Sequence, residues 1–132
     1  MKHISICLFV ILGFSLSLYS QSSKTALEKS HELIEKGIEL YDNEEYQEAL
    51  KCFSSVSVCD PNYTWAVYES SLCYGQLGDN ETAYEKCKEA YDLDKEDAAV
   101  IAFLGNLLDE LGRTREAIEF FKVNIQKKPY NA

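Results

Sequence analysis

The sequence predicts an all-α protein built from antiparallel helix pairs that stack side by side. Three windows carry this prediction: residues 40–53 read LYDNEEYQEALKCF, residues 74–87 read YGQLGDNETAYEKC, and residues 108–121 read LDELGRTREAIEFF. Their starts are 34 residues apart both times. Apolar residues recur at helical spacing in each half of this unit. Because one helix pair is too small to bury its own apolar face, neighbouring pairs are expected to stack.

The three units share positions in a fixed order: a small residue, a large residue three later, an alanine, and a position four residues after the alanine that is aromatic in two units. The members are Gly37, Ser71 and Gly105; Leu40, Tyr74 and Leu108; Ala49, Ala83 and Ala117; and Phe53, Cys87 and Phe121. Together with the closing Pro61 and Pro129, this order resembles the tetratricopeptide repeat. The resemblance implies that the helix pairs form a right-handed αα-superhelix.

The resemblance also implies a domain organisation. Residues 21–29 form a linker and the start of the first helix, and repeats cover residues 30–63, 64–97 and 98–131. Cys87 replaces an aromatic residue, which predicts a thinner core in the second repeat. Asn124 stands where the family prefers alanine, which is unfavourable for packing of the last helix. Lys95 replaces the closing proline, so Asp94 or Asp97 is predicted to cap the next helix.

The stretch YGQLGDNE holds Gly75 and Gly78 and invites comparison with a phosphate-binding loop. Such a loop would follow a strand and carry Lys with Ser or Thr. Here Asp79 and Glu81 follow the glycines and would repel a phosphate. Gly112 is equivalent to Gly78 in the next unit. The stretch is therefore predicted to be a tight turn between two antiparallel helices.

Residues 1–20 have the three parts of a secretory signal peptide. A short basic start with Lys2 and His3 precedes an apolar run of 15 residues, and Ser20 is a small residue at the expected cleavage point. The alternative is an uncleaved anchor, but the run is short for a spanning helix, which needs about 20 apolar residues. Removal of this segment predicts a secreted or periplasmic protein with no membrane contact after processing.

Charge and cysteine spacing exclude several classes of function. The formal net charge of -9 disfavours nucleic-acid binding, which needs clustered Lys and Arg. Signal removal leaves Cys52, Cys59, Cys73 and Cys87 without a C-x-x-C pair, so no metal site is predicted. Export permits disulfides, but the favoured interpretation is four small apolar helix residues. Within one helix Cys52 could not reach Cys59, because seven residues span about 10 Å.

No catalytic site and no cofactor are predicted. After signal removal His31 is the only histidine, and it lies where a solvated helix surface is expected. The carboxylates are spread over helix surfaces without a motif for paired acid–base chemistry. The chain is therefore predicted not to be an enzyme.

The family resemblance implies that a protein or peptide segment binds in a groove lined by the first helix of each pair. The implied groove residues are Ile34, Ile38, Tyr41, Trp65, Tyr68, Leu72, Ala102, Asn106 and Asp109, with Asp42, Gln76 and Glu110 at the mouth. Core packing of the aromatic residues is an equal alternative. Related domains that grip carboxylates use Lys, Arg and Asn on these helices, and only Asn106 fits that pattern. A basic or neutral ligand is therefore favoured.

Three further points stay open at the level of sequence. Ile118, Phe121 and Ile125 share a helix face without a cover, which predicts further repeats in a longer protein or, as the alternative, a second copy of the chain. The sensor region of a larger signalling protein and glycan capture by exposed aromatic residues are alternative functions. Asn62 and Asn80 stand in glycosylation sequons, which chance also explains.

Overall fold

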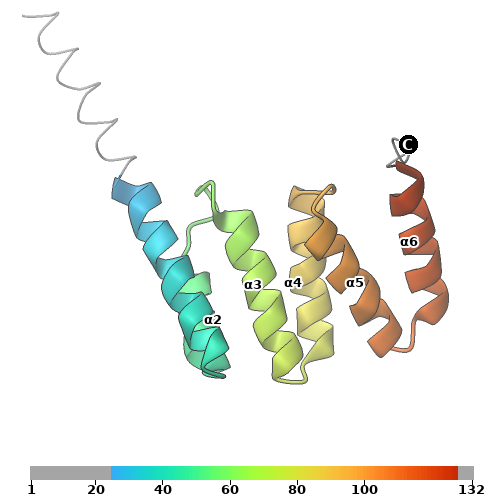
Figure 1. The fold of residues 1–132 in the computed structure, drawn as a ribbon, viewed down its shortest axis with the longest axis horizontal. Helices are drawn as coiled ribbons and strands as arrows, with labels where there is room; N and C mark the ends of the chain where they lie inside the picture. Colours follow the sequence, from blue (N-terminus) through green and yellow to red (C-terminus); the bar gives the residue numbers. More distant parts are fainter. Residues whose placement is uncertain (1–24, 128–132) are drawn as a thin grey trace, which may run out of the picture.

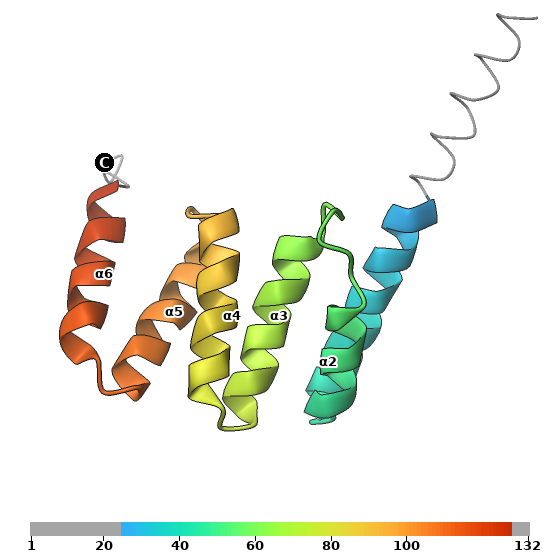
Figure 2. The same ribbon diagram turned by 180° about the vertical axis from the view of Figure 1, so that it is seen from behind.

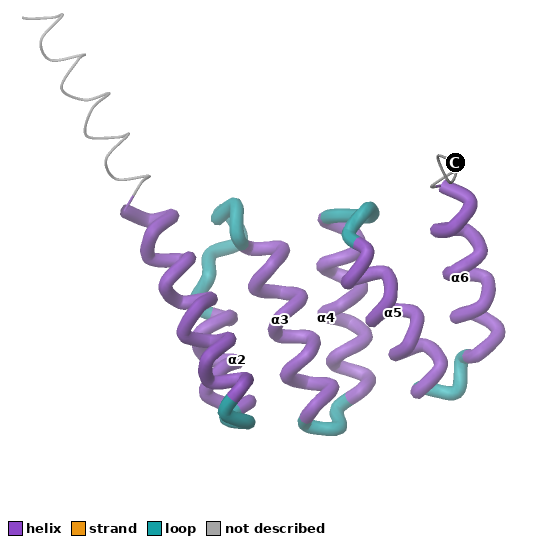
Figure 3. Tube along the Cα trace, in the orientation of Figure 1, coloured by secondary structure: helices purple, strands orange, loops and turns teal. Residues whose placement is uncertain are grey.

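The computed structural model describes residues 25–127, and the predicted signal peptide lies outside them. The described chain forms six helices: an N-terminal helix over residues 25–42, α2 (Tyr46–Ser54), α3 (Tyr63–Gln76), α4 (Asn80–Leu93), α5 (Ala98–Glu110) and α6 (Thr114–Lys127). Loops join these helices, and no strand occurs in this part of the chain (Figure 3). The predicted all-α fold class is confirmed.

The helices stand in a row in the order of the sequence, with the N-terminal helix and α6 at opposite ends (Figure 1). Contacts join α2 to α3, α3 to α4, α4 to α5, and α5 to α6. Seen from behind, α2 and α4 lie in front of the N-terminal helix and α5 (Figure 2). The first helices of the pairs therefore line one side of the solenoid and the second helices the other.

The turn inside each helix pair has one geometry that recurs every 34 residues. The N–H groups of Glu45, Asp79 and Arg113 donate to the carbonyls of Leu40, Tyr74 and Leu108 at 2.8, 3.0 and 2.8 Å. The residue before each donor has positive φ: 63° at Glu44, 78° at Gly78 and 72° at Gly112. This is the closure of a Schellman motif, which satisfies the last carbonyls of a helix. The tight turns predicted at the two glycines are confirmed.

Aspartate side chains fix the starts of two helices. Asp97 accepts hydrogen bonds from the N–H groups of Ala99 at 2.8 Å and Val100 at 3.2 Å. These bonds satisfy donors that lack a partner within the first turn of α5. Asp79 accepts from the N–H of Thr82 at 3.1 Å and starts α4 in the same way. Of the two predicted caps before α5, Asp97 is the one that serves.

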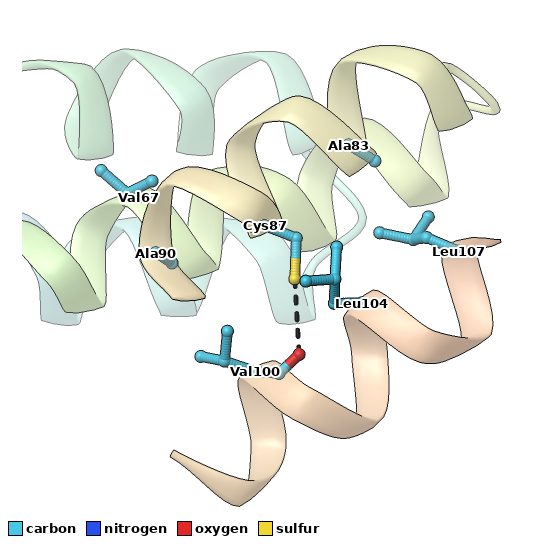
Figure 4. Packing of buried hydrophobic residues seen from close by; sticks show 7 residues of the cluster. All are labelled: Val67, Ala83, Cys87, Ala90, Val100, Leu104 and Leu107. Atoms are coloured by element: carbon cyan, nitrogen blue, oxygen red, sulfur yellow. Dashed lines mark hydrogen bonds between the residues drawn. The ribbon is translucent and has the colours of Figure 1, made fainter. Parts of the chain in front are cut away.

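Small residues on the first helices make room for large residues on the second helices. A Cβ on Gly37 would lie 2.4 Å from Cε1 of Phe53, a ring that is only 2% exposed. In the central pair Cys87 is buried among Val100, Leu104 and other apolar residues, and its thiol donates to the Val100 carbonyl at 3.6 Å (Figure 4). Cys87 thus packs against apolar neighbours in the core, although the second repeat lacks the aromatic side chain that the other two repeats have at this position.

Asn124 is accommodated in the core of the last pair by two hydrogen bonds. Its side chain is buried, with Oδ1 accepting from the Tyr91 hydroxyl at 3.1 Å and Nδ2 donating to the Phe120 carbonyl at 2.9 Å. A buried amide is tolerated when its polar atoms are paired in this way. The expected difficulty of packing Asn124 is therefore resolved by Tyr91.

The four cysteines of the described chain are free thiols. Cys73 and Cys87 are buried, as expected for small apolar helix residues. For Cys59 that expectation was wrong: it is exposed in the loop after α2, which ends at Ser54. Cys52 and Cys59 consequently do not share a helix. Within residues 25–127 no helix has the length and apolar content needed to cross a membrane.

Candidate functional site

Aromatic and polar contacts join the N-terminal helix to α3. The ring of His31 lies 6.1 Å from that of Trp65, centroid to centroid. At the other end of the two helices, the Gln76 amide donates to the Tyr41 hydroxyl at 3.1 Å. These contacts hold residues 25–42 and α3 side by side, so their outer side chains form one continuous surface.

A second aromatic contact extends this surface to α5. The rings of Tyr68 and Phe103 lie 6.3 Å apart and cross at 87°, an edge-to-face pair. Phe103 also covers Gly75, where a Cβ would lie 3.2 Å from the end of its ring. We call the exposed and half-buried side chains of the N-terminal helix, α3 and α5 the first-helix face.

Trp65 is the most exposed aromatic anchor on the first-helix face. It is 38% exposed, and its indole N–H donates to a carboxylate oxygen of Glu69 at 3.0 Å. Burial raises the pKa of Glu69, and the negative charge of Asp42 raises it further. The Glu69 carboxylate therefore lies in a partly desolvated region, and the nearby negative charge of Asp42 disfavours its ionisation.

The structure distributes the predicted groove residues over three environments. Trp65, Ala102, Asn106 and Asp109 are exposed, while Ile38, Tyr41, Tyr68 and Leu72 are half-buried. Ile34 is 0% exposed and packs in the core with Phe53 and Cys73. Its burial removes Ile34 from the surface on which a ligand could lie, which corrects its assignment as a groove residue. Tyr41 and Tyr68 contribute to core packing and to the surface at once.

The predicted groove positions that carry a formal charge at neutral pH are acidic. Asp42, Asp109 and Glu110 are exposed there, and neither Lys nor Arg occupies any of the predicted positions. Asp109 also accepts a hydrogen bond from the Thr114 hydroxyl at 2.6 Å, which ties it to the start of α6. The first-helix face therefore offers carboxylates, amides and aromatic rings to a ligand.

Sequence reasoning missed two residues of this face, Glu69 and Phe103. Glu69 follows Trp65 by four residues, a helical spacing that places both side chains on neighbouring turns of one face. That spacing was available in the sequence. Phe103 could not be found in this way, because its position depends on how α5 packs over Gly75 of α3.

The described residues offer little for catalysis. Burial raises the pKa of the Cys73 and Cys87 thiols to about 12, so both stay protonated at neutral pH, where the thiolate would be the nucleophile. His31 lies 3.3 Å from Glu35 on an exposed helix surface. Across residues 25–127 no group of three or more His, Cys, Asp or Glu side chains is placed to hold a metal ion.

Comparison with known proteins assigns the family. Antiparallel helix pairs with recurring turns define a helical-repeat solenoid. Residues 76–123 match the family model of the tetratricopeptide repeat. The chain superposes on the second TPR of Spaghetti (RPAP3) bound to the HSP90 peptide SRMEEVD, with a TM-score of 0.71 and 18% identity over 86% of this chain and 98% of that one. The chain is a tetratricopeptide repeat protein.

Two curated relatives show the same similarity in sequence. The small glutamine-rich tetratricopeptide repeat-containing protein 2 of Mycosarcoma maydis is 23% identical over 105 residues, 80% of this chain and 30% of the relative. The translocon at the outer membrane of chloroplasts 64 of Pisum sativum is 30% identical over 116 residues, 85% of this chain and 19% of the relative. The chain thus spans less than a third of the length of either protein.

Proposed function

We propose that this chain is a non-catalytic interaction scaffold that holds a protein or peptide segment on its first-helix face. One observation carries the proposal: Trp65 stands exposed between the half-buried Tyr68 and the polar His31, so apolar and hydrogen-bonding groups meet on one surface. Exposed aromatic anchors of this kind are typical of binding hot spots. The Spaghetti domain, which has the same fold, is bound to a peptide and supports this assignment.

We further propose that the bound segment is basic or neutral. The peptide on the Spaghetti domain, SRMEEVD, carries three acidic side chains. On the present chain the first-helix face carries Asp42, Glu69 and Asp109, and an acidic segment there would meet like charges. A cation would instead pair with the carboxylates and lie against the Trp65 ring. A positively charged ligand is therefore favoured over an acidic one.

Export of the scaffold rests on residues 1–20, whose basic start, apolar run and small exit residue have the order of a secretory signal. We propose that this segment directs the chain to a secreted or periplasmic location. N-terminal sequencing of the protein recovered from its native host tests this. A first residue at Gln21 or shortly after supports export, and recovery of intact Met1 contradicts it.

Fluorescence anisotropy with two labelled peptides tests the binding proposal. One peptide is SRMEEVD, and the other is SRMKKVK with an amidated end, which reverses the acidic charges. We expect the basic peptide to bind at least tenfold more tightly, with an affinity that falls as salt rises. Glu69→Gln and Trp65→Ala should each weaken it about fivefold or more. Leu77→Ala is the matched control, because Leu77 is 40% exposed but lies in the turn after α3.

Two outcomes contradict the proposal. Tighter binding of SRMEEVD would show that the carboxylates do not set ligand charge. Equal affinity for wild type and both variants would place the ligand away from the first-helix face. Capture of a glycan through Trp65, the alternative, would be recognised by an affinity that salt does not change.

The α6 end of the solenoid carries exposed apolar side chains that could form a second contact surface. On α6, Ile118 and Ile125 are 49% and 65% exposed, while Phe121 is half-buried over Gly105. We propose that a further repeat of a longer chain, or a second copy, covers this end. Sedimentation velocity of wild type and Ile125→Glu tests the second copy: a dimer that dissociates in the variant supports it, and a monomer in both contradicts it.

A further inference from the structure

A hollow of about 380 Å³ is lined by residues of α2, α3 and α4. Its apolar lining includes the half-buried Leu50, Tyr63 and Tyr74 and the almost fully buried Phe53 and Val67, and Ser70 also lines it. Lys51 on α2 and Lys86 on α4 also line it. Residues of α2 and α3 and one residue of α4 form this hollow, and none of the predicted groove residues lines it. Its volume is within the range of small-molecule sites in proteins, about 300–1,000 Å³.

Comparison with the next gap along the solenoid shows where the lining of this hollow is more polar. The residue 34 positions after Ser70 is Leu104, which is 3% exposed and fills the core between α4 and α5. The residue 34 positions after Lys86 is Phe120, whose ring packs 5.2 Å from that of Tyr91. The first gap thus has a serine and a lysine where the next gap has a leucine and a phenylalanine, while Phe53 stands where the next gap has Cys87.

The charged residues that line this hollow are both basic, although the whole chain is acidic. The chain has 22 acidic and 13 basic residues, yet the residues that line the hollow include Lys51 and Lys86 and no carboxylate. Each lysine has a partner on its own helix, at 2.6 Å to Glu48 and 2.9 Å to Glu89. Solvent-exposed pairs of this kind contribute about 1 kcal/mol or less. An ammonium group also has three donors, so both lysines can accept a further anion.

Ser70 adds a hydrogen-bonding group inside the hollow. Its hydroxyl donates to the Ala66 carbonyl at 2.8 Å, and the side chain is 8% exposed. The hydroxyl oxygen has two lone pairs and, with its proton already committed, serves as an acceptor. The hollow therefore combines an apolar lining, one buried acceptor and two cations on facing helices.

We propose that this hollow binds a small amphipathic carboxylate, with its aromatic or branched acyl group against the half-buried Leu50, Tyr63 and Tyr74 and its carboxylate between Lys51 and Lys86. The apolar group is stabilised there because its surface is removed from water. The carboxylate gains charge-assisted hydrogen bonds from the two ammonium groups. The site is independent of the peptide proposed for the first-helix face and can be tested without it.

Titration of ¹⁵N-labelled protein with 4-phenylbutyrate, followed by amide chemical shifts, tests the proposal. We expect saturable shifts in α2, α3 and α4, and at least fivefold weaker binding of the neutral 4-phenylbutyramide. Ser70→Leu, which copies Leu104, should fold and lose at least tenfold in affinity because it fills the hollow. Lys51→Gln and Lys86→Gln should each weaken binding about threefold to fivefold. Lys88→Gln is the matched control, since Lys88 is exposed on α4 and does not line the hollow.

The proposal is overturned by any of three results. The first is no saturable shift at 10 mM probe, and the second is equal affinity for the acid and the amide. The third is unchanged affinity in folded Ser70→Leu. Should Ser70→Leu fail to fold, the two lysine variants decide: affinity equal to that of Lys88→Gln overturns the assignment of the anion site, and loss in both supports it.

Discussion

The first and the central helix pairs meet the same packing requirement with opposite choices of residue size. In the first pair the buried ring of Phe53 occupies the space that a Cβ on Gly37 would need. In the central pair Ser71 and Cys87 stand at the equivalent positions, and both are 0% exposed. A larger residue on the first helix goes with a smaller one on the second. The two positions of a pair are therefore coupled, because a close-packed interior responds to their combined volume.

The third pair returns to the first arrangement. A Cβ on Gly105 would lie 2.0 Å from Cζ of Phe121, closer than the equivalent contact in the first pair. Phe121 is nevertheless only half-buried, because no described helix follows α6. The glycine and the ring are matched within a pair, while burial of the ring also depends on the neighbouring pair.

The largest effect is expected from giving the central pair the aromatic residue of its neighbours without the matching glycine. Cys87→Phe places a ring against Ser71 and Val100, both fully or almost fully buried, and overpacking of this kind costs about 3 kcal/mol. In the double variant Ser71→Gly with Cys87→Phe, the space is restored and most of the loss should be recovered. Urea unfolding followed by circular dichroism measures both.

The double variant tests directly whether positions 71 and 87 are coupled. Glycine within a helix is itself unfavourable by about 0.5–1 kcal/mol relative to alanine, so Ser71→Gly alone should be destabilising. Recovery of stability only when both changes are present would establish coupling between the two positions. If the two changes simply add, the size-matching explanation of the central pair is wrong.

A smaller effect is expected from adding a single methyl group to the first pair. Gly37→Ala brings Cβ into the Phe53 ring, and overpacking exceeds the gain in helix propensity by about 1–2 kcal/mol. Gly75→Ala is the matched control, because its Cβ meets only the edge of Phe103 at 3.2 Å or more. Thermal unfolding should lower Tm for the first variant and leave it nearly unchanged for the second. Equal Tm for both would show that Phe53 moves aside freely.

Features that depend on local residue order could be predicted from the sequence. The Schellman turns at Gly78 and Gly112 follow from glycine after a helical segment, and the cap at Asp97 follows from an aspartate before one. The all-α class followed from the helical spacing of apolar residues and the 34-residue repeat. None of these needs knowledge of how separate helices meet.

Features that depend on contacts between pairs could not be predicted. Ile34 was predicted to line the groove, but its side chain lies inside the core of the first pair. The hollow beside Ser70 and Lys86 could not be predicted because it depends on how α2, α3 and α4 pack together. The exposure of Cys59 depends on where α2 ends, and the ends of helices are less certain in a sequence than their existence.

The smallest effect is expected where the second and third pairs meet, at the hydrogen bond between Tyr91 and Asn124. Alanine is the residue the family prefers at position 124 and has the better helix propensity, so propensity alone predicts that Asn124→Ala stabilises the protein. We expect the opposite, a loss of about 1 kcal/mol, because the Tyr91 hydroxyl loses its acceptor. In a Tyr91→Phe background the same change should be neutral or stabilising. A double-mutant cycle measured by urea unfolding gives the coupling free energy between Tyr91 and Asn124. A coupling of zero would show that this hydrogen bond does not stabilise the interface.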